Sequence, residues 1–189
     1  MSYFDISIDN DITYLLTEIG KKVKVNNISA KAIINNTTQE RNFDDKRIIT
    51  HEELRRGMYI EYNNLWFLVV SEINDKRYNT YYKGIMRRCN FDIKFIVDKK
   101  LYLFYSIIES NKFNIENNNF YSTSGDIINI TIPATDITRQ IAIDDRIIKF
   151  NTAWKVQGID YTKDGLLILN CKRDTVDNNI DDIDREIAD

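Results

Sequence analysis

The side chains of this sequence that gather in one stretch and could do chemistry are basic. Between residues 75 and 100 eight Lys or Arg outnumber three Asp, and aromatic rings are interleaved with them, including Tyr78, Tyr81, Tyr82 and Phe91. Cations among aromatic rings are what a surface needs to follow a nucleic-acid backbone and stack on bases. A solvated strand face with core aromatics explains the same run. The net charge of −3 argues against nucleic-acid binding by this chain alone, because such binding rests on a net basic surface. The candidate residues are Lys76, Arg77, Lys83, Arg87, Arg88 and Lys94.

Residues typical of catalytic and metal sites are sparse. His51 is the single histidine, and it lies in a stretch, 50–53, with the spacing of a capping box, which favours a short helical turn. Metal sites usually need several His or Cys ligands, and catalytic triads need a His beside a nucleophile. Cys89 and Cys171 are far apart in sequence and do not form a metal-type pair. Two free thiols are favoured over a disulfide.

The acidic residues do not suggest an acid–base pair either. Asp144 and Asp145 are adjacent, as are Asp181 and Asp182, and adjacent residues of a strand face opposite sides of a sheet. The sequence has no glycine-rich loop of the kind that binds phosphates or dinucleotides. We therefore expect a protein that is not an enzyme and that uses no cofactor or metal.

The elements that would position any site are organised around a strand–turn–strand pattern that occurs twice, in residues 57–70 and 145–158. In each copy the alternation of apolar and polar residues predicts a half-buried strand. The Asn-containing pairs 63–64 and 151–152 predict tight turns, because Asn tolerates the left-handed backbone conformation. The strand after each turn carries a tryptophan.

A constant offset of 88 residues relates the two copies: it is the difference between Trp154 and Trp66, and between Phe150 and Tyr62. These four residues are the predicted structural core, and we expect both tryptophans to be buried. The repeat fits either a duplicated domain or two similar hairpins of one barrel. The second interpretation is favoured, because neither a second helix nor a linker accompanies the repeat.

The N-terminal part of the chain combines a helix, a hairpin and a loop. Residues 11–20 show helical periodicity and end at Gly20, and residues 22–34 alternate around an Asn-Asn turn. Residues 35–46 are polar and loop-like. The apolar stripe of the helix fits docking on the chain's own core or on a neighbouring subunit, and its residues are Ile12, Leu15, Leu16 and Ile19.

Roughly ten short strands with turn signals between them predict a mainly β protein, an antiparallel barrel or sandwich with a short N-terminal helix and hairpin. We expect three regions: a helix–hairpin arm with its polar loop (1–50), a barrel (51–172) and an acidic C-terminal tail (173–189). For the tail, a solvated and frayed segment is favoured over one that orders on assembly. The Asn-rich stretch 111–120 is expected to be a mobile loop.

The sequence also limits where the protein acts. No apolar run approaches the length needed to span a bilayer, and the N-terminus does not resemble a secretory signal. We therefore expect no membrane association.

Three stretches, 15–34, 56–89 and 146–169, together resemble a known group of proteins. They are similar to the small virion structural proteins of the head–tail joining region in tailed phages and prophages of low-GC Gram-positive bacteria. Head-closure (stopper) and tail-adaptor proteins of that region have a similar size and a similar β-barrel content. No catalytic or binding residue carries over by position.

The resemblance implies a ring, a hexamer or dodecamer, at the head–tail neck of the virion, assembled in the cytoplasm of the bacterial host. Its partners would be further copies of itself, a portal or adaptor protein and a tail-tube or tail-completion protein. The basic run 76–100 would then face genomic double-stranded DNA passing through the ring. The helix–hairpin 11–34 would be an assembly arm, and removal of residues 1–34 would leave the barrel folded. The alternative is a β-barrel protein that binds single-stranded nucleic acid through the same basic run.

Overall fold

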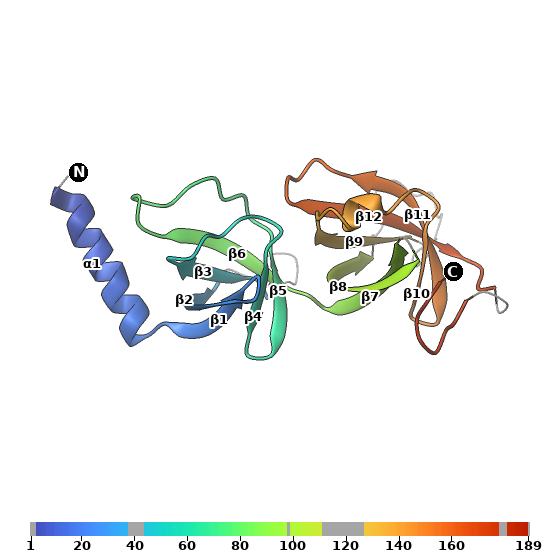
Figure 1. The fold of residues 1–189 in the computed structure, drawn as a ribbon, viewed down its shortest axis with the longest axis horizontal. Helices are drawn as coiled ribbons and strands as arrows, with labels where there is room; N and C mark the ends of the chain where they lie inside the picture. The colour runs from blue at the N-terminus through green and yellow to red at the C-terminus, as the bar shows by residue number, and fades with distance from the viewer. Residues whose placement is uncertain (1–2, 38–43, 98, 111–126, 178–180, 189) are drawn as a thin grey trace, which may run out of the picture. The chain divides into compact units, whose positions relative to one another are not determined.

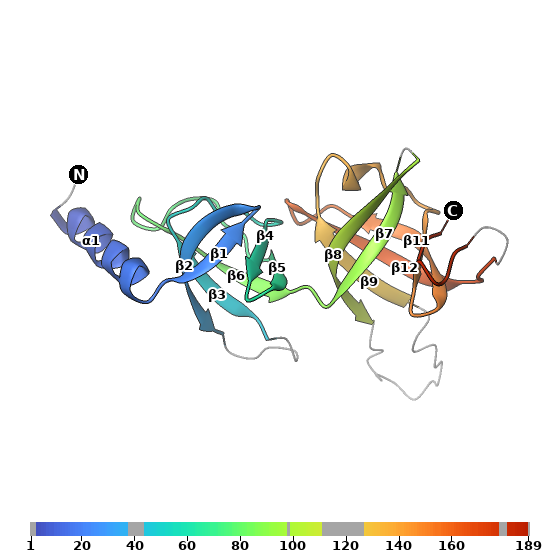
Figure 2. The ribbon, with the colours of Figure 1, turned by 60° about the horizontal axis from the view of Figure 1, so that its bottom comes forward.

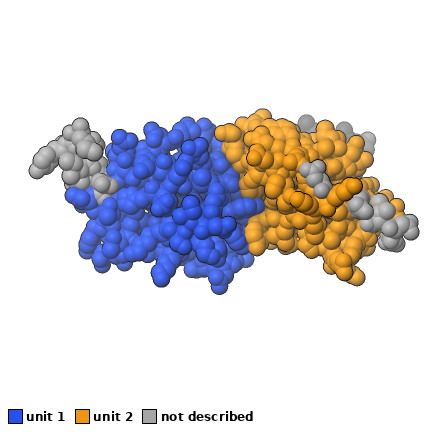
Figure 3. All heavy atoms as spheres, viewed as in Figure 1, with its two compact units in different colours: residues 1–89 blue, residues 90–189 orange. Residues whose placement is uncertain are grey.

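Strands dominate the structure of this protein, which we describe from a computed structural model. The described residues are 3–37, 44–97, 99–110, 127–177 and 181–188, with side chains from residue 10 onward. Strands make up most of the regular structure and there is one N-terminal α-helix, which confirms the mainly β class. The chain forms two compact units, residues 1–89 and residues 90–189 (Figure 3). The predicted loop 111–120 lies outside the described residues.

The first unit is a closed six-stranded barrel preceded by a helix (Figure 1). Its strands are hydrogen-bonded in the order β1-β2-β3-β6-β5-β4, and β4 pairs back to β1 through Ile60 and Val25. All neighbouring strands are antiparallel. The elements are α1 (Tyr3–Glu18), β1 (Lys21–Val25), β2 (Ile28–Asn36), β3 (Lys46–Thr50), β4 (Tyr59–Tyr62), β5 (Leu65–Val69) and β6 (Tyr82–Arg88).

The second unit is a six-stranded antiparallel sheet that curls in the same way (Figure 2). Its order, β7-β8-β9-β12-β11-β10, repeats the order of the first unit with each number raised by six. We call the two sheets the first and second barrel. The elements are β7 (Phe91–Val97), β8 (Lys100–Ser110), β9 (Ile127–Pro133), a 3-10 helix (Thr138–Gln140), β10 (Arg146–Lys149), β11 (Thr152–Asp160) and β12 (Leu166–Asp174).

The identical strand order corrects the preference for two hairpins in one barrel. The hairpin β4–β5 belongs to the first barrel and the hairpin β10–β11 to the second, at equivalent places. Each barrel has its own buried cluster, with Phe67 and Met86 in the first and Phe95 and Trp154 in the second. The sequence repeat is therefore the visible part of a repeated fold.

The chain divides after Cys89, not at the predicted boundaries near residues 50 and 172. β1 and β2 are barrel strands, because Val23, Val25 and Ala32 are buried in the same core as the rest of the first barrel. The polar stretch 35–46, which suggested a separator, instead connects β2 and β3. Removal of residues 1–34 would therefore delete two strands and open the first barrel, so the helix–hairpin is not a separable arm.

Helix α1 starts earlier than the predicted residue 11 and docks on its own barrel. Of the predicted stripe, Leu16 is buried and Ile12 is half-buried, while Leu15 and Ile19 are 39% and 59% exposed. The docking is also polar. The Thr13 hydroxyl lies 3.2 Å from His51 Nε2, and His51 Nδ1 lies 3.1 Å from the Thr80 carbonyl oxygen. The histidine thus joins the helix to the barrel.

The junction between α1 and β1 requires a glycine, so we expect Gly20→Ala to loosen the helix. A Cβ at Gly20 would lie 2.1 Å from the backbone oxygen of Leu16, which must then move. We expect a loss of about 1–3 kcal/mol in the stability of the docked helix, within the usual range for backbone clashes. Amide hydrogen exchange of residues 10–18 should accelerate. Gly158→Ala is the control, because its Cβ would meet nothing nearer than 3.7 Å, and equal exchange in both variants would contradict the prediction.

The turn of the second hairpin lies one residue earlier than the 88-residue repeat predicts, and this shift decides which side chains are buried. In the first barrel the turn residues with positive φ are Asn63 and Asn64, as predicted. In the second they are Phe150 and Asn151, not the predicted pair 151–152. A shift of one residue moves every side chain of a strand to the other face. The structural offset between the hairpins is therefore 87 residues, so Phe67, not Trp66, is the counterpart of Trp154.

The register explains which of the four predicted core residues are buried. Trp154 is 6% exposed and lies in the core, as predicted. Trp66 is only half-buried: it lies on the outer face, edge-on to Tyr59, so its predicted burial is wrong. Tyr62 is half-buried and packs against the first core. Phe150 is 47% exposed because it is a turn residue, so it is not a core residue.

The two cysteines are free, one in each unit, and burial raises the pKa of both thiols from 9.0 to about 12. Only the thiolate reacts readily with alkylating agents. We therefore expect Cys89 and Cys171 to resist iodoacetamide at pH 8 in the folded protein and to react in denaturant. The folded state keeps these protons, so this contribution to stability is complete below pH 9 and is lost as the pH rises toward 12. Rapid labelling of folded protein, read by mass, would contradict the prediction.

Candidate functional site

The predicted basic residues do not lie in one unit. Lys76 and Arg77 are in the connection between β5 and β6, three more lie on β6, and Lys94 is on β7 in the second unit. The run 76–100 therefore crosses the boundary between the two barrels. The three residues on β6 are Lys83, Arg87 and Arg88.

Several of these cations already have partners within the chain. Arg87 donates from Nε and Nη2 to the two carboxylate oxygens of Asp45, at 2.8 and 2.9 Å. Lys94 Nζ donates to the Arg185 carbonyl oxygen at 2.5 Å. Lys76 Nζ lies 5.6 Å from the centre of the Tyr82 ring. Internal pairing lowers the charge that these residues can offer to a nucleic acid.

A second group of charges, which the sequence analysis did not single out, lies where the second barrel fails to close. In the first barrel β1 and β4 are hydrogen-bonded, but within the described residues no ladder joins their counterparts β7 and β10. The two strands still lie side by side. Side chains bridge them, with the Phe91 and Phe150 rings edge-to-face at 4.8 Å. We call this place the seam, formed by β7 and β10.

Lys149, the last residue of β10, is a buried cation at the seam. Its side chain is 8% exposed, and Nζ lies 2.7 Å from Glu186 Oε2 and 3.6 Å from Asp92 Oδ1. A buried charge is tolerated only when it is paired, because it has lost its hydration. Asp92 comes from β7, whereas Glu186 comes from the C-terminal segment. The two carboxylates therefore hold β10 to β7 and to the end of the chain.

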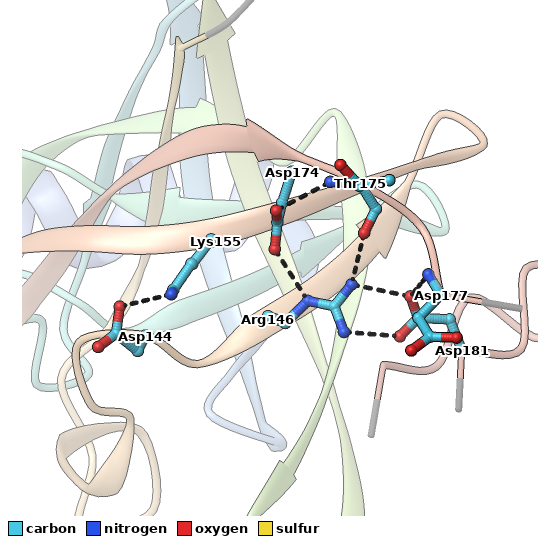
Figure 4. A network of polar contacts seen from close by, with 7 residues as sticks. All are labelled: Asp144, Arg146, Lys155, Asp174, Thr175, Asp177 and Asp181. Carbon is cyan, nitrogen blue, oxygen red and sulfur yellow. Dashed lines mark hydrogen bonds and ion pairs between the residues drawn. The ribbon is translucent and has the colours of Figure 1, made fainter. Parts of the chain in front are cut away.

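Arg146, at the start of β10, makes a denser set of contacts with the end of the chain (Figure 4). Its Nη1 and Nη2 atoms donate to the two carboxylate oxygens of Asp181 at 3.1 and 2.8 Å. Nε donates to Asp174 Oδ2 at 3.2 Å, and Nη2 also donates to the Thr175 carbonyl oxygen at 2.9 Å. The Asp181 side chain is 0% exposed and also accepts the backbone N–H of Asp177. Two parallel charge-assisted bonds fix both the position and the orientation of the carboxylate.

Residues 181–188, which we call the C-terminal clasp, form a tight turn at the seam. Asp182 and Ile187 exchange two backbone hydrogen bonds at 2.8 and 2.9 Å. Beyond the turn, Ala188 is buried against Ile148 and Ala153. The clasp is therefore an ordered part of the second unit, not the frayed segment that its acidity suggested. Its carboxylates pair with the nearly buried cations Arg146 and Lys149. The local sequence of the tail does not reveal these partners.

A pocket of about 290 Å³ opens beside the clasp, on the seam. Its walls come from β7, from β10 with the two acidic residues before it, and from the clasp. The lining residues are Phe95, Ile96, Asp144, Asp145, Arg146 and Ala188. The clasp therefore does not fill the seam completely.

Metal-binding clusters and membrane-spanning helices are two further features that bear on function. No group of three or more His, Cys, Asp or Glu in this part of the chain is placed to hold a metal ion. Nor is any described helix long and apolar enough to cross a membrane.

Comparison with known families agrees with the division of the fold. Residues 2–88 match the family model described as the YomX N-terminal domain, and residues 91–172 match the YomX C-terminal domain. The first match ends with β6 and the second ends within β12, and the clasp lies beyond both. Comparisons with curated proteins and with solved structures gave no match. YomX itself is encoded in the SPbeta prophage region of Bacillus, and its domains are phage-derived. The chain is therefore a phage protein built from the two domains of the YomX family.

Proposed function

We propose that this phage protein is a structural component of the virion, a ring at the head–tail connector that joins the portal side to the tail. Its partners in this role are further copies of itself, a portal or adaptor protein, and a tail-tube or tail-completion protein. The ring would surround the passing DNA. The observation that carries the proposal is an apolar outer face on the β7–β8 hairpin, in a protein of phage origin.

The outer face of this hairpin presents three exposed aliphatic side chains. Ile96 and Leu101 are directly opposite one another across the two strands, and they are 37% and 50% exposed. Leu103, also 50% exposed, is two residues along on the same face, opposite Lys94. Side chains in such positions are neighbours on a sheet. A contiguous apolar patch on the surface is typical of a protein–protein contact.

The hairpin is also placed to reach a neighbour. β9 pairs with β8 only from Ile107 onward, so the part of the hairpin with the apolar patch extends beyond β9 (Figure 2). A projecting patch that meets a different surface on the next copy gives a head-to-tail contact. Such contacts close into rings when the rotation between copies permits. A second copy of this chain is therefore the partner that we propose for this face.

The test uses the double variant Leu101→Lys and Leu103→Lys in the phage that encodes the protein. Both side chains are half exposed on the outer face, so we expect the subunit to fold normally but to fail in assembly. Electron microscopy should then show separate heads and tails. Ile28→Lys is the matched control, because Ile28 is a 62% exposed aliphatic residue on the other barrel. Joined, DNA-filled particles from the double variant would overturn the proposal.

A second candidate function, binding of single-stranded nucleic acid, is favoured by one loop. Between β5 and β6, Arg77 and Tyr81 form an isolated bridge that presents Tyr78, which is 61% exposed. The rings of Tyr78 and Tyr81 are 6.4 Å apart, with Lys76 nearby in sequence. An exposed ring beside cations suits base stacking. Under this candidate, oligonucleotide binding by the monomer falls steeply with salt and is lost in Tyr78→Ala. Under the connector proposal we expect only weak binding.

A further inference from the structure

We infer that the seam of the second barrel is a docking site for an acidic C-terminal segment, and that the clasp of one copy can occupy the seam of another. The inference concerns contacts between copies of the purified chain. It does not depend on the proposed place in the virion.

The seam is a site built to receive a segment. In the first barrel the equivalent strands β1 and β4 close by backbone hydrogen bonds. In the second barrel β7 and β10 leave their facing edges without a common ladder, within the described residues. Two nearly buried cations, Arg146 and Lys149, lie there, with side chains 17% and 8% exposed. Cations so placed need anionic partners, so the seam selects acidic segments.

The clasp matches the seam through charge and through one small apolar residue. The Asp181 carboxylate accepts hydrogen bonds from Arg146, and the Glu186 carboxylate accepts one from Lys149. The Arg185 carbonyl oxygen accepts one from Lys94. Ala188 completes the contact against Ile148. The clasp contributes no strand to the six-stranded sheet and no residue to the main core of the second barrel. It can therefore leave the seam without dismantling the barrel.

The occupant that best replaces the clasp is the clasp of another copy. An identical segment restores every contact, so exchange between copies costs little in interaction energy. In dilute solution a chain's own clasp has the higher effective concentration and keeps the seam. Where copies are held close together, as in an assembly, exchange becomes competitive. Each exchanged clasp then ties one subunit to the next.

Charge reversal can test the exchange, because in each single variant the clasp can no longer pair with the seam of its own chain. In the Arg146→Asp chain the seam repels its own clasp, and in the Asp181→Arg chain the clasp repels its own seam. Mixed together, the acidic seam of the first matches the basic clasp of the second, and the reciprocal pair is unchanged. The double variant Arg146→Asp with Asp181→Arg is the control, because both reversed charges meet within one chain.

We expect the double variant to remain a monomer near 22.3 kDa and each single variant to have a displaced clasp. The mixture should form a heterodimer of twice that mass, seen by light scattering, and dissociate at high salt. If a single variant does not fold alone, co-expression of the two tagged chains replaces mixing, and co-purification of both tags is the expected result. Two chains that fold or are produced together yet never associate, while the double variant is stable, would overturn the inference.

Discussion

Replacement of Trp154 by Ala should unfold the second barrel, whereas the same replacement of Trp66 should leave the first barrel folded. Trp154 is buried among the strands of its core, and its indole N–H donates to the Lys149 carbonyl oxygen at 3.0 Å. Truncation of a buried Trp costs about 3–5 kcal/mol, which is a large share of the stability of a small domain. Trp66 is on the outer face, so its loss should cost only about 1 kcal/mol.

The two units must be followed separately in this experiment, because a single unfolding midpoint would mix them. Hydrogen exchange read by mass spectrometry distinguishes peptides of β1–β6 from peptides of β7–β12. We expect Trp154→Ala to accelerate exchange throughout the second set and to leave the first set unchanged. Similar effects of the two substitutions, each on its own barrel, would show that the buried and outer positions are energetically alike.

Loss of the Arg146 side chain should be the most damaging change to the charges of the second unit. Arg146→Met leaves the Asp181 carboxylate, with its side chain 0% exposed, without its cation. Removal of one partner from a buried ion pair typically costs about 3–5 kcal/mol, because the other charge stays buried and unpaired. We expect the C-terminal clasp to detach, because this returns Asp181 to water. The second unit should then lose the stability that the docked clasp contributes, at most about that amount.

Lys155→Met is the matched control for this variant. Lys155 also pairs with an Asp, Asp144 at 2.9 Å, in the same region of the molecule (Figure 4). That pair is exposed, with side chains 40% and 73% accessible, and exposed pairs contribute little to stability. Urea unfolding of the second unit and hydrogen exchange of residues 181–188 should change in Arg146→Met and stay near wild type in Lys155→Met. The same small effect from both would refute the role of the buried pair.

The strands and most turns of this fold were predictable because their signals are local. The Asn26-Asn27 turn joins β1 and β2, and the Asn63-Asn64 turn joins β4 and β5, as expected. The β10–β11 turn was missed, because a bulky residue such as Phe150 rarely adopts a φ of 55°. A contact from another strand helps to hold it there, since its ring packs edge-to-face on Phe91. That contact is not visible in the hairpin's own sequence.

The separation of the two barrels was missed for a related reason. β6 and β7 follow one another with only Cys89 and Asn90 between them, so no linker composition marks the boundary. Closure of a barrel depends on which distant strands meet, such as β4 on β1, and alternation within a strand carries no such information. The repeat at 57–70 and 145–158 was a correct signal, but its meaning depended on the order of the twelve strands found in the described residues.

The candidate site was the least predictable part of the molecule. The basic run 76–100 was conspicuous because its charges are close together in the sequence. Arg87 nevertheless pairs with Asp45, and Lys94 donates to the Arg185 carbonyl oxygen, each within its own unit. The seam depends instead on partners 35 to 37 residues apart, Arg146 with Asp181 and Lys149 with Glu186. The acidic tail was visible in the sequence, but nothing local indicated that two nearly buried cations pair with it.

The position of the clasp after all the strands of its barrel has a consequence for synthesis on the ribosome. β7 and β10 are translated before residues 181–188, so the seam emerges while its cover does not yet exist. At about 5–20 residues per second, the 32 residues from Lys149 to Asp181 take roughly 2–6 seconds to add. During that interval neighbouring nascent chains on one messenger present uncovered strand edges to each other, and such edges invite pairing. Residues 181–188 can thus cover the seam only after all strands of the second barrel have been translated, whereas the first barrel closes through its own strands β1 and β4.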